Sequence, residues 1–109
     1  MAADWPNDAD GDVLRNLQKK SFDFGRAVKV DFFVDFFDWP PCETAIASIK
    51  RAKPDACIKL YSEDQYILIE IIHEVTYDFV VSVQAELTNI CRPFGGVCES
   101  WGVLHHSAL

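Results

Sequence analysis

Four carboxylates in apolar, strand-like segments are the side chains of this sequence best suited to chemistry. Asp31 and Asp35 lie in one such segment, and Glu70 and Glu74 lie in another. Neighbouring carboxylates can perform acid–base catalysis, but only where a pocket shifts their pKa values. The face of a sheet offers no such pocket, so we predict that these acids attract a basic partner instead of catalysing a reaction.

The metal-binding and nucleophilic residue types form no recognised motif. The cysteines are Cys42, Cys57, Cys91 and Cys98. They have no C-x-x-C pairing and no histidine at ligand spacing, so we predict free, buried thiols and neither a zinc site nor a redox motif. A disulfide between two of them stays open as an alternative, although a cytoplasmic location disfavours it. His73 falls on the apolar side of its segment, where a packed histidine is commoner than a base. His105 and His106 stand near the end of the sequence, where disorder is commoner than metal binding. We therefore predict no cofactor and no resident metal.

An acidic cluster, W-P-N-D-A-D-G-D, precedes the first predicted helix, which should run from about Gly11 to Lys20. If Gly11 is aligned with the glycine of a calcium loop, Pro6 falls at the first ligand and Leu17 at the closing glutamate. Calcium binding is therefore excluded. We interpret these acids as caps that stabilise the start of the helix.

Length and charge indicate one acidic globular domain spanning residues 1–109. The chain is long enough for one core but too short for two, and half of its residues are hydrophobic. Seventeen acidic and ten basic residues give a net charge of −7, which disfavours direct binding of nucleic acid because phosphates would be repelled. The polar, acidic N-terminus does not resemble a secretory signal, and no apolar run is long enough to span a membrane. We expect a cytoplasmic protein.

The stretch from Val28 to Trp39 predicts the central strand of a sheet. Its even-numbered positions up to Phe36 are all apolar, which is the period of two expected of a strand with one buried side. A strand this long and apolar would invite aggregation at a sheet edge, so neighbours should pair with it on both sides. The segment from Tyr66 to Val75 has the same pattern and is its natural neighbour.

The remaining segments complete an α+β fold. A helix is expected after the Pro40-Pro41 pair and another after Thr76, with short strands from Ala56 to Tyr61 and from Val97 to Leu104. Apart from the first helix, the order is β-α-β-β-α-β. This is the ferredoxin-like arrangement, with one four-stranded antiparallel sheet and both crossover helices on one face. The first and third strands should form the central pair.

The other face of this sheet is open and is the predicted binding surface. Its candidate partner-binding residues are Asp31, Phe33, Asp35, Glu70, Ile72, Glu74 and Trp101. Trp101 fits either face by alternation, and we place it partly exposed on this one. RNA-binding sheets surround such aromatics with lysine and arginine, whereas this surround is acidic and suits a basic peptide. Two alternatives stay open, namely that the first helix covers this face or that it pairs two copies in a homodimer.

Three short motifs resemble the regulator of ribonuclease E activity B (RraB) family. They are Asn7-Asp8 with Gly11-Asp12-Val13-Leu14, Phe32-Phe33-Val34 with Trp39-Pro40, and Phe94-Gly95-Gly96 with Trp101-Gly102. The resemblance spans nearly the whole chain, and its last motif is the most specific. It implies a ferredoxin-like, non-catalytic inhibitor that binds ribonuclease E away from its catalytic centre, at the basic RNA-binding scaffold region.

The charge pattern and the resemblance lead to one functional prediction. The chain should regulate RNA degradation by binding the basic scaffold region of ribonuclease E, or another basic protein, through its acidic and aromatic face. The alternative is a homodimeric interaction module with an unrelated partner. A third hypothesis, an enzyme that uses Asp31, Asp35 and His73, requires these residues to share a deep pocket.

Overall fold

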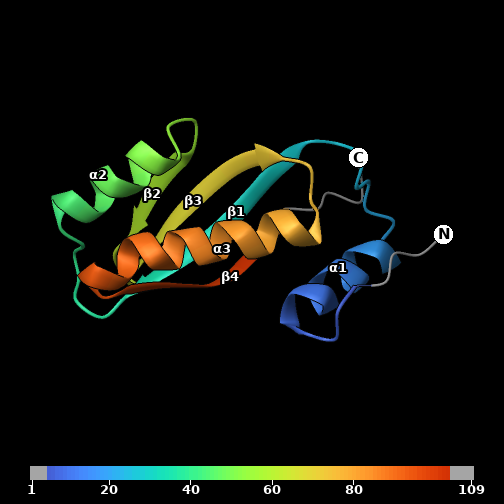
Figure 1. The fold of residues 1–109 in the computed structure, drawn as a ribbon, viewed down its shortest axis with the longest axis horizontal. Coiled ribbons are helices and arrows are strands. Elements are labelled where there is room, and N and C mark those ends of the chain that lie inside the picture. Colours follow the sequence, from blue (N-terminus) through green and yellow to red (C-terminus); the bar gives the residue numbers. More distant parts are fainter. Residues whose placement is uncertain (1–4, 104–109) are drawn as a thin grey trace.

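An open four-stranded sheet carries the helices of this chain on one of its faces (Figure 1). The computed structural model describes residues 5–103. In chain order the elements are α1 (Ala9–Lys19), β1 (Val28–Phe36), α2 (Glu43–Ala52), β2 (Cys57–Tyr61), β3 (Tyr66–His73), α3 (Tyr77–Cys91), the short 3₁₀ helix η1 (Arg92–Phe94) and β4 (Gly96–Val103). Leu104, which we expected in the last strand, lies outside the described residues, as do His105 and His106.

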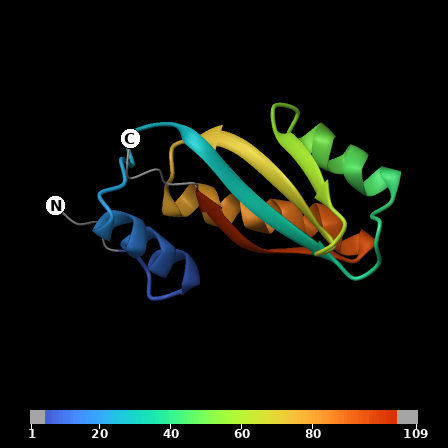
Figure 2. The ribbon, with the colours of Figure 1, turned by 180° about the vertical axis from the view of Figure 1, so that it is seen from behind.

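The strands pair in the order β2-β3-β1-β4, and each pair is antiparallel. β1 and β3 are therefore the central pair, as their long apolar alternation predicted, and the α+β class is confirmed. Seen from behind, the sheet lies in front of α2 and α3 (Figure 2). Both central strands are shorter than expected: β1 ends at Phe36 and not at Trp39, and β3 ends at His73 and not at Val75. Val75, beyond β3, is buried in the core.

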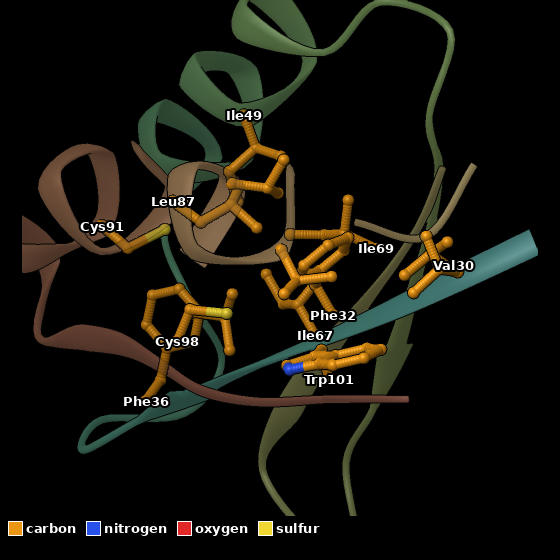
Figure 3. Close-up of a cluster of buried hydrophobic side chains, with 14 of the residues drawn as sticks. Val30, Phe32, Phe36, Ile49, Ile67, Ile69, Leu87, Cys91, Cys98 and Trp101 are labelled. Carbon is orange, nitrogen blue, oxygen red and sulfur yellow. The ribbon is translucent and has the colours of Figure 1, made fainter. Parts of the chain in front are cut away.

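The core lies between the sheet and the helices. Val30, Phe32 and Val34 of β1 are fully buried, and Phe32 pairs with Ile69 across the two central strands. Figure 3 shows Phe32 and Ile69 in one buried cluster with Leu87 of α3 and Ile49 of α2. Burying a side chain of this size stabilises a fold by about 1.5–3 kcal/mol. The even-numbered side of β1 therefore fixes which face of the sheet the helices cover.

The first helix begins with a cap that the sequence predicted. The Asp8 side chain accepts a hydrogen bond from the Gly11 backbone N–H at 2.8 Å, and its other oxygen accepts one from the Tyr77 hydroxyl at 2.6 Å. These two hydrogen bonds lower the pKa of Asp8. The interpretation of the acidic cluster as a helix cap is therefore confirmed at this residue.

Asp10 anchors α1 to the helix-bearing side of the sheet. Its Oδ1 accepts hydrogen bonds from Trp101 Nε1 at 2.8 Å and from Gln84 Nε2 at 3.0 Å. Leu14 and Leu17 of the same helix join the core. In Figure 2, α1 lies beside α3 near the end of β4 and away from the open face. The alternative in which the first helix covers the open face is therefore wrong.

Candidate functional site

Trp101 lies on the helix-facing side of β4 and is only 7% exposed, so our placement of it on the open face is wrong. The cause is a register shift in the pairing of β1 with β4. Val34 pairs with Cys98, but its neighbour Phe33 pairs with Ser100, two residues further on. Such a bulge reverses the alternation of side chains along the strand. As a result, Cys98 and Trp101 both face the core although they are three residues apart (Figure 3).

The central strands bring most of the other predicted residues together on the open face. Those on β1 and β3 are Asp31, Phe33, Asp35, Glu70 and Ile72. Asp31 and Glu70 are direct partners across the two strands, and Ile72 is 72% exposed. Glu74 follows the last residue of β3, so it does not belong to the sheet face.

The centre of this face is charge-compensated. Glu70 Oε1 lies 3.3 Å from Lys59 Nζ on β2, and Glu70 Oε2 lies 3.9 Å from Lys29 Nζ on β1. Burial favours a higher pKa for Glu70, but the hydrogen bond to Lys59 and the two lysine charges hold its pKa below the ordinary value. Asp31 differs, because burial and the charge of Glu70 raise its pKa. Its Oδ1 is buried and has no hydrogen-bond partner within residues 5–103.

These two carboxylates should respond oppositely to neutralisation. The pKa of Asp31 is raised above its ordinary value of 3.8, so as the pH rises the unfolded chain loses this proton before the folded chain does. Ionisation of Asp31 therefore disfavours folding, and Asp31→Asn should stabilise the protein at pH 7. The pKa of Glu70 is lowered, so its ionised form stabilises the folded protein above about pH 4.5, and this stability is lost as the pH falls. Glu70→Gln should therefore destabilise the protein at pH 7. Each change should be below about 1 kcal/mol, because Lys29 and Lys59, the lysines that face these carboxylates, are 59% and 49% exposed and solvent screens their charges.

Urea denaturation at pH 7 and at about pH 3 measures both effects. Near pH 3 both carboxyl groups are mostly protonated in the unfolded chain, so the difference in stability between the two variants should be smaller at that pH. A loss of stability in Asp31→Asn at pH 7 would contradict the burial and repulsion that we assign to this carboxylate.

A row of aromatic rings crosses the open face next to these charges. The rings of Phe33 on β1 and Tyr66 on β3 meet edge to face with centroids 5.5 Å apart. Tyr66 in turn stacks on Tyr61 of β2, with centroids 5.0 Å apart and planes 19° apart. Aromatic pairs of this geometry add about 0.5–1.5 kcal/mol to the burial of the rings. The three rings form a continuous apolar strip across three strands.

An open groove lies where β1 ends beside the start of β4. It encloses about 290 Å³ and is lined by Asp35, Phe36, Phe37, Val97 and Glu99. The Phe37 side chain is 90% exposed, whereas that of Phe36 is buried. Asp35 and Glu99 are both exposed, and among the described residues neither forms an ion pair with lysine or arginine. We call this feature the β1–β4 groove.

Sequence reasoning left Phe37 and Glu99 out of the predicted site. Alternation along β1 was sufficient to place Phe37 on the open side, next to Asp35. Glu99 is different, because the bulge in β4 breaks the alternation at this point. Only the pairing with β1 brings Glu99 to the same groove as Phe37.

His73 lies apart from the carboxylates of the open face. It is the partner of Val28 at the far end of β1, and its ring stacks on Phe79 of α3 with centroids 3.8 Å apart and planes 2° apart. Asp31 and Asp35 belong to the opposite face of the sheet. The three residues that the enzyme hypothesis requires therefore do not share a site.

The four cysteines are free in the structure. Cys91 and Cys98 are buried, and burial raises their pKa values to about 11 and about 12. Cys42 and Cys57 are exposed, so the predicted burial is wrong for this pair. Cys42 precedes α2 and Cys57 begins the edge strand β2, where neighbouring elements leave them uncovered.

The described part of the chain contains neither a metal-binding cluster nor a membrane-spanning helix. Within residues 5–103, no group of three or more histidine, cysteine or acidic side chains is placed to hold a metal ion. None of the helices in that range has the length and apolar character needed to cross a membrane.

One family of known proteins matches most of the chain. The family described as regulator of ribonuclease activity B matches residues 7–103. Neither a search of curated proteins nor a search of solved structures found a match. The matched range includes α1, the whole sheet and the β1–β4 groove. The chain therefore belongs to the regulator of ribonuclease activity B (RraB) family.

Proposed function

We propose that this protein is a non-catalytic inhibitor that binds a basic segment of a ribonuclease through one end of its open face. Membership of the RraB family implies regulation of ribonuclease activity, and hence a protein partner. The segment that we propose is the basic scaffold region of ribonuclease E. The observation that carries this proposal is the β1–β4 groove, which is lined by the exposed Phe37 and by Asp35 and Glu99, two acids that form no ion pair within residues 5–103.

The acids on this face differ in their availability to a partner. Glu70 is already paired with Lys59 and Lys29, and its side chain is only 9% exposed. Asp35 and Glu99 keep their charges exposed. A cationic segment would therefore gain more at the groove end of the face than at its centre, because no internal ion pair has to be broken there.

Inhibition would follow from competition for the same basic segment. A net charge of −7 attracts a cationic segment over a Debye length of about 10 Å at moderate salt. Once bound, the acidic protein covers arginine and lysine side chains that would otherwise contact RNA phosphates. This mechanism needs no catalytic group in the regulator.

The experiment is a titration of this protein with the purified scaffold region of ribonuclease E over a salt series, with and without a labelled RNA. We expect affinity to fall at least about tenfold as salt rises from about 50 to about 300 mM, because exposed charges are screened. We also expect the protein to displace the RNA. Affinity that is indifferent to salt, or RNA that stays bound when the scaffold region is saturated, would contradict the proposal.

A homodimer is the second candidate, and the exposed apolar surface of the open face favours it. Ile72 is 72% exposed and Tyr61 is 39% exposed, and both lie on this face. Two copies could bury these side chains against each other. Sedimentation velocity at several concentrations separates the candidates, because a monomer at every concentration excludes the dimer.

A further inference from the structure

We propose that the β1–β4 groove is a seat for one arginine side chain of the partner segment, and that it selects arginine over lysine. This inference rests on the proposed function, since it assumes a basic protein partner. It adds the position of the contact and the chemical class of the side chain that is recognised.

The backbone holds the aromatic side of this seat in place. Phe36 is buried, so the next residue, Phe37, points to the other side of the chain and is 90% exposed. The Phe37 backbone N–H donates to the Gly95 carbonyl at 3.1 Å, and Gly95 has the left-handed φ of 80° that favours glycine. The backbone that carries the ring is therefore anchored, so less backbone entropy is lost when a partner contacts Phe37.

The acidic side of the seat comes from two different strands. Asp35 belongs to β1 and Glu99 to β4, and both line the groove together with Phe37. Among the described residues neither is matched by a lysine or arginine, in contrast to Glu70 at the centre of the face. The groove therefore offers negative charge that the fold itself leaves uncompensated.

Arginine is the side chain that uses both features at once. Its planar guanidinium can pair with carboxylates through several N–H donors while its face stacks on an aromatic ring. A lysine ammonium can pair with the carboxylates, but it is more strongly hydrated and cannot stack as a plane. The volume of about 290 Å³ is at the lower limit of small-molecule pockets, which suits a single side chain better than a whole ligand.

The test compares two short capped peptides of equal length and charge, one of arginine and glycine and the other of lysine and glycine. Binding to the whole protein is followed by the amide chemical shifts of the residues that line the groove. We expect the arginine peptide to bind about fivefold more tightly, which corresponds to about 1 kcal/mol of stacking. Its largest shifts should fall at residues 35–37 and 97–99.

Three variants separate the two parts of the seat. Phe37→Leu keeps an apolar side chain and should abolish the preference for arginine while leaving lysine binding unchanged. Asp35→Asn combined with Glu99→Gln should weaken both peptides by about tenfold. The control is Asp55→Asn, which removes the same kind of exposed charge from the loop before β2, across the sheet from the groove, and should change neither peptide. All these positions are exposed, so unchanged thermal unfolding should show that every variant folds.

Equal affinity of the wild-type protein for the two peptides, or an arginine preference that persists in Phe37→Leu, would overturn the inference. The same variants are then titrated with the scaffold region of ribonuclease E. If that region binds all of them as well as it binds the wild type, the groove is not the binding site, and only the coarser part of the proposed function, inhibition by binding a basic segment, stands. If the region does not bind the wild type, the proposed function itself fails.

Discussion

Replacing Trp101 with alanine should lower the free energy of unfolding by about 3–5 kcal/mol. Its side chain is only 7% exposed and lies in the core between β4 and the helices, where Trp101 pairs with the fully buried Phe32 of β1 (Figure 3). The variant leaves a cavity and also removes the hydrogen bond from Nε1 to Asp10, 2.8 Å long, that holds α1 in place. For a domain of this size the midpoint of thermal unfolding should fall by at least about 12 °C. Far-ultraviolet circular dichroism in a urea titration measures the loss without relying on tryptophan fluorescence.

The matched variant Trp101→Phe separates packing from the hydrogen bond. It keeps an aromatic ring in the core but cannot donate to Asp10, so its loss should be smaller than that of Trp101→Ala. If Trp101 lay on the open face, where we placed it from the sequence although alternation fits either face, alanine would cost only about 0.5 kcal/mol. A small loss in the alanine variant would therefore contradict the bulge in β4.

The features predicted correctly from the sequence depend on short-range patterns. Alternation from Val28 to Phe36 identifies one buried side and makes β1 central, since such a strand needs partners on both sides. The caps are equally local, because Asp8 and Thr76 each accept a hydrogen bond from a backbone N–H three residues later. In each case one segment carries all the information that the prediction needs.

The errors arise where cross-strand pairing decides the structure. The apolar residues of β4 include Val97, Cys98 and Trp101, which no single alternation can place on one face. Only the pairing of Ser100 with Phe33, next to the bulge, decides which of these residues face the core. Cross-strand pairing also sets what alternation along one strand cannot show, namely which lysines neutralise an acid and which acids meet in a groove.

The candidate site illustrates the same limit. Alternation placed Asp31, Asp35 and Glu70 on one face correctly, and from this the sequence predicted a broadly acidic surface. The structure divides that surface, because Lys59 reaches Glu70 from β2 while Asp35 lies by the groove. The electrostatic character of the face therefore depends on the register of all four strands.

Gly96→Ala should lower the free energy of unfolding by about 1–3 kcal/mol through overpacking. An added Cβ would lie 2.7 Å from Cε1 of Phe36 and 2.8 Å from Cβ of Cys91, and both of these side chains are buried in the core. Gly102→Ala, on the same strand, is the control, because its Cβ would meet nothing within 4 Å. Urea denaturation of the two variants compares them directly, and equal losses would show that backbone freedom, not packing, explains the effect.

The position of Gly96 also connects the stability of the core to the proposed seat. The shortest overlap is with the Phe36 ring, so we expect this ring to be displaced, and Phe36 and Phe37 are adjacent residues that both line the groove. We therefore expect Gly96→Ala to reduce binding of the arginine peptide under conditions in which the variant is still folded, whereas Gly102→Ala should leave it unchanged. If Gly96→Ala is destabilised but binds the arginine peptide as the wild type does, the groove does not depend on the packing of Phe36.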